Sequence, residues 1–363
     1  MKELKNFYKN KKVLVTGVTG FKGAWLTSWL LEMGSKVCGI GYNPNKNKNL
    51  FYQLKLNKKT KLHLFDLREF KKLDKIIKKF KPSIIFHLAA QPLIFESYKS
   101  PHKTIDINVK TTLNIMEASR LNKFVKSIII VTSDKCYENS FKTVGFKETD
   151  RLGGIDPYSA SKASVEIITR AYYESFFKIG NKCGVSTGRA GNVIGGGDWS
   201  PNRLIPDCIR SILNKKIIFL RKPNFNRPWQ FVLEPIKGYL MLAKKQYENP
   251  RKYSGAWNFG TNPKSITSVL DVVKKLINRW GDGKLKFKKS NLYEQENLQL
   301  NINKSKKILK WNPTYNVTES VNVTTDWYYE VLKKKRSPVV TTLSQIKKYM
   351  NESKKKIKYL KIR

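Results

Sequence analysis

Short apolar runs alternate with longer amphipathic stretches along the first half of the chain. Six runs have the length and the turn-bounded flanks of buried strands, at residues 13–16, 36–40, 61–65, 83–88, 127–132 and 184–187. Between them, helical spacing of apolar residues predicts helices near 21–33, 68–80, 103–121 and 157–177. Alternating strands and helices predict an α/β fold whose parallel sheet is covered on both faces.

The alternation weakens after residue 188. The remaining pattern predicts short strands at 256–259 and 284–288 and helices at 267–280 and 319–332. We therefore expect a sheet domain over residues 1–188 and a smaller substrate-binding lobe over 189–335, partly interleaved with it. Residues 336–363 form a lysine-rich tail, which we expect to be frayed and solvated from residue 352.

A glycine-rich turn follows the first apolar run and precedes the first helix. Strand, turn and helix in this order are what a Rossmann-type dinucleotide-binding unit requires. The glycines allow a tight turn, and the free amides of the helix N-terminus suit a pyrophosphate. The predicted cofactor-binding residues of this turn are Gly17, Thr19, Gly20, Phe21, Lys22 and Gly23.

A second polar cluster closes the strand at 127–132. Ser133, Asp134 and Lys135 follow it directly, and side chains at the carboxyl end of a parallel strand face the ligand crevice. Tyr158 and Lys162 stand four positions apart at the start of a helix, so both lie on one face. A cation ~4 Å from the phenol is worth roughly 4 kcal/mol at an effective dielectric of ~20, about three pKa units. This pairing predicts a tyrosine that acts as a base.

Taken in order, the glycine turn, Ser133 to Lys135 and the Tyr158–Lys162 pair resemble the extended short-chain dehydrogenase/reductase family. Within it, the chain is similar to the CDP-glucose 4,6-dehydratases. The Asp134–Lys135 pair is the most specific sign, since related hexose dehydratases carry a glutamate at the lysine position. The resemblance runs through residues 16–26, 87–97, 131–139, 152–162, 189–207, 227–240 and 296–311.

This resemblance implies an internal redox cycle with NAD on the nucleotide sugar CDP-glucose. By this resemblance Tyr158 removes the proton of the C4 hydroxyl, and Ser133 forms a hydrogen bond to the C4 oxygen. Asp134 protonates the departing C6 hydroxyl, and Lys135 is the base that removes the C5 proton. From the residues alone, either Asp134 or Lys135 could be the C5 base, because an adjacent aspartate raises the pKa of a lysine. Further cofactor residues are Asp66, Leu67, Leu88, Ala89, Ala90, Tyr158 and Lys162. The substrate residues are Gln91, Asn192, Arg203 and Arg227.

Several positions carry more than one interpretation. The second strand ends in residues 39–43 without the carboxylate that binds a ribose 2′-hydroxyl, so the residues leave NAD and NADP open, although Lys46 and Lys48 follow. Asp66 could also cap the helix after it. By resemblance Asn108 supports the active site, although such an asparagine is more often at the surface. Phe231 stands where the family often has a histidine.

Arg189 opens the glycine-rich loop at 189–199 and, with Asn192 and Arg203, offers donors suited to a pyrophosphate.

Bulk composition bounds the function further. The 363 residues carry a formal charge of +44, which is a property of proteins that bind nucleic acids. Because the lysines are spread along the whole chain, they fit a solvated basic surface that attracts a nucleotide diphosphate substrate. The four cysteines and three histidines show no metal-ligand spacing. The cysteines are far apart and are expected to be free thiols in a reducing compartment. We expect a cytoplasmic homodimer that binds neither metal, membrane nor nucleic acid. An epimerase or dehydrogenase of the same fold, or an RNA-binding protein with a relict nucleotide site, are the alternatives.

Overall fold

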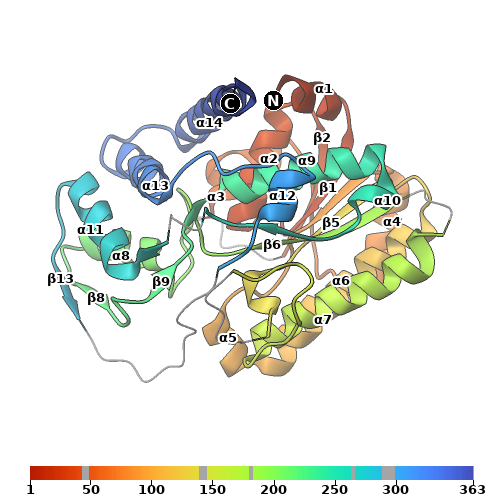
Figure 1. Cartoon of the computed structure of the whole chain (residues 1–363), viewed down its shortest axis with the longest axis horizontal. Helices are drawn as coiled ribbons and strands as arrows, with labels where there is room; N and C mark the ends of the chain where they lie inside the picture. Colours follow the sequence, from red (N-terminus) through yellow and green to blue (C-terminus); the bar gives the residue numbers. More distant parts are fainter. Residues whose placement is uncertain (43–48, 139–144, 180–182, 263–265, 288–298, 363) are drawn as a thin grey trace.

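A seven-stranded parallel sheet forms the centre of the molecule in the computed structural model (Figure 1). The structure describes residues 1–42, 49–138, 145–179, 183–262, 266–287 and 299–362, with side chains up to residue 356. The strand order is β11-β6-β5-β4-β1-β2-β3, and all neighbouring pairs are parallel. The strands are β1 (Lys12–Thr16), β2 (Lys36–Gly41), β3 (Lys61–Leu64), β4 (Ile84–His87), β5 (Ser127–Val131), β6 (Gly184–Ala190) and β11 (Gly255–Phe259). The predicted doubly wound sheet is confirmed.

Both faces of the sheet are buried, because successive strand residues point to opposite sides. Val13 and Val15 pack with α1 (Lys2–Tyr8), α2 (Phe21–Glu32) and α9 (Leu233–Glu248). Leu14 points to the other side, into a second core with residues of α4 (Phe70–Phe80), α6 (Pro101–Leu121) and α7 (Pro157–Tyr172). Figure 1 shows these two helical layers on either side of the strands.

The smaller lobe is built from short strand pairs and three helices. The helices are α8 (Leu204–Leu213), α11 (Val269–Trp280) and α13 (Val317–Leu332). The strand pairs are β7 (Val193–Ile194) with β10 (Gln230–Phe231), β8 (Ile218–Leu220) with β13 (Leu285–Phe287), and β9 (Asn226–Arg227) with β12 (Thr267–Ser268). Short helical elements complete the described chain: α3 (Leu50–Gln53), η2 (Leu56–Lys58), α5 (Ile94–Lys99), η3 (Asp134–Cys136), η4 (Tyr173–Phe177), α10 (Pro250–Tyr253) and α12 (Asn303–Lys307).

One predicted lobe element belongs to the main sheet, and one predicted helix changes type at its end. The strand predicted at 256–259 is β11, which pairs with β6 as the edge of the main sheet, and α9 covers that sheet. Trp257 and Phe259 are fully buried there, so burial of these rings places the strand. The helix predicted over 157–177 ends as an α-helix at Tyr172 and continues as the π-helical turn η4. A domain boundary at residue 188 stays a prediction.

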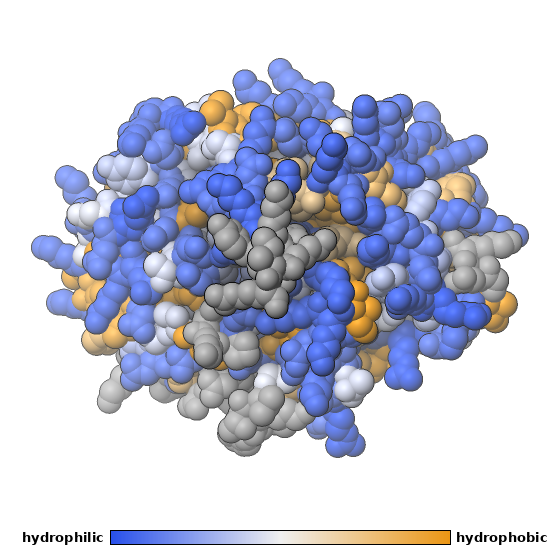
Figure 2. Space-filling model, turned by 45° about the horizontal axis from the view of Figure 1, so that its top comes forward, coloured by the Kyte–Doolittle hydropathy of each residue, from blue (hydrophilic) through white to orange (hydrophobic). Residues whose placement is uncertain are grey.

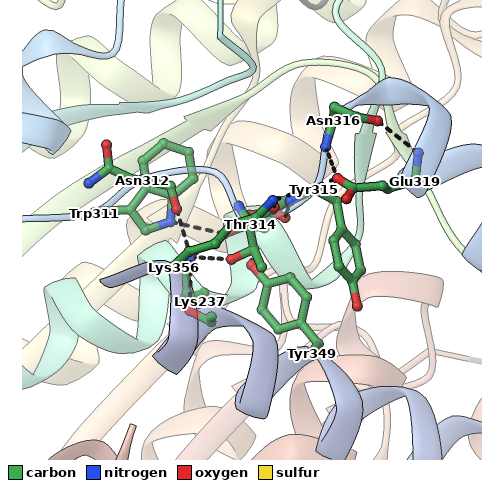
Figure 3. A network of polar contacts seen from close by, with 11 residues as sticks. Lys237, Trp311, Asn312, Thr314, Tyr315, Asn316, Glu319, Tyr349 and Lys356 are labelled. Carbon is green, nitrogen blue, oxygen red and sulfur yellow. Dashed lines mark hydrogen bonds and ion pairs between the residues drawn. The ribbon is translucent and has the colours of Figure 1, made fainter. Parts of the chain in front are cut away.

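The C-terminal segment is an ordered helix, α14 (Pro338–Ile362), which packs on α2 and α13. The frayed, solvated segment expected from residue 352 is wrong for its first residues, since the helix continues through them and Ser353 is 1% exposed. Tyr349 donates its phenol proton to Glu234 Oε2 at 2.6 Å, and Lys237 Nζ donates to Ser353 Oγ at 3.3 Å. Figure 3 shows Tyr349, Lys237 and Lys356 directed at the segment around Thr314.

The view in Figure 2 is covered mostly by hydrophilic residues, with hydrophobic residues in small separate patches. Among the described residues, no helix is long and apolar enough to span a membrane.

Candidate active site

A cavity of about 960 Å³ opens at the carboxyl ends of the parallel strands and extends under the smaller lobe. Its volume lies at the upper end of the range for small-molecule sites. Apart from Arg189, the residues predicted to be catalytic or to bind cofactor or substrate line its wall: Gly17, Thr19, Gly20, Phe21, Lys22, Gly23, Asp66, Leu67, Leu88, Ala89, Ala90, Gln91, Ser133, Asp134, Lys135, Tyr158, Lys162, Asn192, Arg203 and Arg227. The structure thus brings together segments more than two hundred residues apart.

The glycine-rich turn can take no larger residue at its first and last glycines. Gly17 has a φ of +66°, and a Cβ there would lie 2.7 Å from the backbone nitrogen of Ala89. A Cβ on Gly23 would lie 2.2 Å from the carbonyl oxygen of Gly17. The turn therefore lies directly against the end of β4 and leaves the N-terminus of α2 on the cavity wall. This cradle fits a dinucleotide whose pyrophosphate binds to the amides of the helix.

The far end of the cleft has a charged pair. Arg68 holds the carboxylate of Asp66, with its Nη2 2.6 Å from Oδ2 and its backbone nitrogen 2.9 Å from Oδ1. The hydrogen bond from Arg68 lowers the pKa of Asp66, so this carboxylate stays ionised. The sequence analysis did not predict a role for Arg68. Its position two residues after Asp66 was the signal that the two side chains could pair. Tyr42 lines the cavity at the end of β2, while Lys46 and Lys48 lie outside the described residues.

The start of α7 is fixed by local capping. Asp156 accepts a hydrogen bond from the backbone nitrogen of Ser159 at 2.9 Å, and Pro157 occupies the first turn. This start places Tyr158 and Lys162, which are 8% and 5% exposed, on the cavity wall.

The pKa of Tyr158 does not follow the prediction. Burial raises it to about 12, and the opposing effects come from a hydrogen bond with Ser133 and from the charge of Arg203. The ammonium group of Lys162 instead donates to the carbonyl oxygen of Val131 at 3.3 Å. Burial lowers the pKa of Lys162 itself to about 8.

Asp134 is held as a buried carboxyl group. It is 3% exposed and accepts a hydrogen bond from Ser133 Oγ at 2.9 Å on Oδ1. Its buried Oδ2 has no hydrogen-bond partner in the described part of the chain, and a Cβ on Gly191 would lie 2.9 Å from it. Burial raises the pKa of Asp134, while Lys135 opposes the rise. A carboxyl group in such a place can hold a proton and deliver it.

The substrate side of the cavity carries two arginines. Arg203 Nη1 bonds Asp198 Oδ2 at 2.8 Å, a partner that sequence reasoning missed. Arg227 is 7% exposed, and its guanidinium lies 5.2 Å from the ring centre of Phe225. Both cations are suited to a phosphate of the substrate.

Two polar predictions near the fourth strand have a structural explanation. The side-chain amide of Gln91 lines the cavity, but it donates to Thr104 Oγ1 at 2.8 Å and accepts from the Leu93 nitrogen at 2.6 Å. Its amide is therefore engaged by its own loop. Asn108 is buried, accepts from the backbone nitrogen of Gln91 at 2.7 Å and donates to Ser161 Oγ at 2.9 Å. It joins this loop to α7 and is not a surface residue.

Two residues near the lobe are not cavity donors. Arg189, predicted to suit a pyrophosphate, is 3% exposed and pairs with Glu166 at 2.8 Å behind the cavity wall. That prediction is wrong, because a buried carboxylate takes the guanidinium. Phe231 is fully buried, with its ring against Trp25, Tyr315 and Tyr349. It serves the core.

No group of three or more His, Cys, Asp or Glu residues suited to a metal occurs in the described part of the chain.

Comparisons with known proteins agree with this geometry. The family model described as GDP-mannose 4,6 dehydratase matches residues 14–324. CDP-glucose 4,6-dehydratase of Salmonella typhimurium is 40% identical over 330 residues, which cover 89% of this chain and 92% of that protein. The solved dTDP-glucose 4,6-dehydratase of Bacillus anthracis, in complex with NAD, has a TM-score of 0.74 at 22% identity and covers 89% of this chain and 98% of that chain.

A solved epimerase has the same fold. UDP-glucose 4-epimerase of Thermotoga maritima, with UDP-glucose, has a TM-score of 0.76 at 21% identity and covers 88% of this chain and 99% of that chain. The extent of the family match and the 40% identity to a dehydratase therefore show that this chain belongs to the GDP-mannose 4,6-dehydratase family, within the extended short-chain dehydrogenases/reductases.

Proposed function

We propose that this chain is an NAD-dependent CDP-glucose 4,6-dehydratase, a hydro-lyase that converts CDP-glucose to CDP-4-keto-6-deoxyglucose and water. The observation that carries the proposal is the convergence of Ser133, Asp134, Lys135, Tyr158 and Lys162 on one cavity wall, in a chain 40% identical to such an enzyme. An epimerase would need the Tyr158–Lys162 pair but not the buried acid beside Lys135.

NAD, when bound, supplies a hydride acceptor that later returns the hydride, so that no net oxidant is consumed. The glycine turn and α2 would hold its pyrophosphate, Asp66 its adenine end, and Lys162 the ribose next to the nicotinamide. The fit is supported by the close approach of Gly17 to Ala89, which keeps this wall free of side chains. The described end of β2 has neither a carboxylate nor an arginine, so the choice of NAD rests on the relatives.

Tyr158 and Ser133 would act at the C4 oxygen of the sugar. The hydrogen bond with Ser133 and the charge of Arg203 both favour the ionised phenol against the effect of burial. Tyr158 then accepts the proton of the C4 hydroxyl, and Ser133 orients that oxygen. The resulting C4 ketone acidifies the C5 hydrogen.

Asp134 would deliver its proton to the departing C6 hydroxyl, for which its raised pKa is suited. Lys135 would accept the C5 proton. With both steps the sugar loses one water, and Arg203 and Arg227 would hold the diphosphate during the elimination.

The experiment incubates the purified protein with CDP-glucose and NAD and follows the sugar nucleotide by mass spectrometry. Loss of one water without accumulation of reduced cofactor supports the proposal. No mass change with CDP-glucose, dTDP-glucose or GDP-mannose overturns it and leads to assays for a C4 epimer.

Two variants test the roles in the elimination. Asp134→Asn should lose elimination while it retains NAD binding, because the amide cannot donate a labile proton. Lys135→Ala should do the same, and near-normal elimination by this variant would assign the C5 base to Asp134.

We also propose that the chain forms a homodimer through α6 and α7. Apolar residues are exposed on these helices, with Ile105 44%, Leu121 49% and Ile167 57% exposed. Ile167→Glu should shift the mass measured by light scattering to that of a monomer.

The buried, unpaired thiols of Cys38, Cys136, Cys183 and Cys208 support a cytoplasmic location. The product of the proposed reaction suits the supply of deoxysugars for a lipopolysaccharide O-antigen.

A further inference from the structure

Glu166 is a buried carboxylate that lies behind the catalytic wall on α7, one turn after Lys162. It is 4% exposed, and its ion pair with Arg189 of β6 is 2.8 Å long, with both side chains 3% exposed. Thr132 donates its hydroxyl to Oε1 at 2.5 Å, and Thr187 of β6 donates to Oε2 at 2.6 Å. One side chain therefore ties α7 to the ends of β5 and β6.

The contact with Thr132 places Glu166 next to the proposed chemistry. Thr132 lies between Val131, whose carbonyl oxygen accepts from Lys162 Nζ at 3.3 Å, and Ser133, whose hydroxyl bonds Asp134. A carboxylate that fixes Thr132 thus fixes the residues on both sides of it.

Among the described residues, four groups outside the Tyr158–Lys162 pair act electrostatically with the ammonium group of Lys162. They are Glu166 on α7, Cys136 on η3, His87 on β4 and Lys22 on α2. Burial raises the pKa of Cys136 well above its usual range and lowers that of His87 to about 3, so both are neutral at pH 7. Lys22 is a base whose charge repels Lys162. Of these groups, only the ion-paired carboxylate of Glu166 stabilises the charged form of Lys162 at neutral pH.

We propose that Glu166 is a positioning residue for the dehydratase reaction: its carboxylate, one helical turn from Lys162 and bonded to Thr132, offsets the ammonium charge and holds the end of β5 that carries Ser133 and Asp134. The inference rests on the proposed function for its role in turnover, but its electrostatic part concerns this chain alone. A purely structural ion pair would stabilise the fold without changing the titration of Lys162.

The experiment measures the rate at which a small anhydride acetylates Lys162, by peptide mass spectrometry over a range of pH. Lys162 lines the cavity, so the reagent has access to it, and the rate follows its neutral fraction. Glu166→Gln removes the charge but keeps the size of the side chain. Its titration midpoint should fall by about one to two pH units, since a carboxylate one helical turn away is lost.

Two further variants separate this effect from misfolding. Glu166→Gln with Arg189→Met removes both charges of the buried pair, a change that is often neutral for stability, and should keep the lowered midpoint. Glu166→Asp keeps the charge and should titrate close to wild type.

The matched control is Glu174→Gln, which removes an exposed carboxylate paired with Lys178 at 2.6 Å. It should leave the midpoint of Lys162 unchanged. A midpoint within about 0.3 pH units of wild type in both Glu166→Gln variants overturns the proposal. Because acetylation needs no turnover, this result is independent of whether CDP-glucose is the substrate.

Discussion

The contact between Tyr349 and Glu234 gives a quantitative test of how the C-terminal helix is held. Glu234 is fully buried, and besides the Tyr349 hydroxyl at 2.6 Å its oxygens accept from the backbone nitrogens of Thr314 at 2.9 Å and Tyr315 at 2.7 Å. Lys237 Nζ lies 3.9 Å from Oε2. Tyr349→Phe removes one charge-assisted hydrogen bond and no carbon atom. We expect the free energy of unfolding to fall by about 1.5–3 kcal/mol.

The loss should depend on pH with a definite sign. Burial raises the pKa of Glu234 above its unfolded value, and the hydrogen bond from Tyr349 opposes this rise. Between the pKa of Glu234 in the unfolded chain and its higher pKa in the native protein, the native protein binds more protons than the unfolded chain. Stability therefore falls as the pH rises through this range. Without the hydroxyl the native pKa rises further. The difference between variant and wild type should thus be larger at pH 8 than at pH 5.

The assay is urea unfolding followed by tryptophan fluorescence at the two pH values. Tyr329→Phe is the matched control, since its ring packs edge-on against Trp280 and keeps that contact without the hydroxyl. It should change stability by less than about 0.5 kcal/mol. A similarly small change in Tyr349→Phe at pH 8 would show that the buried carboxylate does not depend on α14.

Three further changes have expected outcomes. Gly17→Ala should weaken NAD binding, measured by calorimetry, at least about tenfold, because its Cβ would lie 2.7 Å from the nitrogen of Ala89. The control is Gly281→Ala, which also replaces a glycine of positive φ, +89°, but has no atom within 4 Å of its Cβ; it should lower stability and leave NAD binding unchanged. Burial lowers the pKa of His87 to about 3, so wild-type stability falls as the pH drops below about 6.5, and His87→Asn should lose roughly 2 kcal/mol less between pH 6.5 and 5. Phe231→His should destabilise by about 1–3 kcal/mol in urea, because it buries a polar ring among aromatic ones; an unchanged midpoint would show that the site supplies a partner.

Local pattern was enough to predict the sheet and the position of the cavity. The apolar runs set β1, β2, β4, β5 and β6 to within a few residues, because a strand buried on both faces needs an apolar sequence. The strand β3 was also placed correctly, although it is the largely exposed edge strand of the sheet. The glycine turn and the residues after β5 follow parallel strands, whose carboxyl ends share one edge of the sheet. For this reason the predicted site residues other than Arg189 and Asn108 line one cavity, and their roles are proposals.

Contacts between distant segments decided the rest. Nothing near Arg189 indicates whether it faces a ligand or a buried carboxylate, since its partner Glu166 is 23 residues away. The same holds for α14. Its sequence is rich in lysine, yet Tyr349 donates its hydroxyl to the buried carboxylate of Glu234. The pKa of Tyr158 was misjudged because helical spacing gives the distance to a cation but not the burial of the phenol. Sequence determined the strands of the central sheet, most of the helices between them and where the cavity opens, because these depend on local periodicity and turn chemistry. Tertiary structure determined charge partners and protonation, because both depend on which surfaces exclude water.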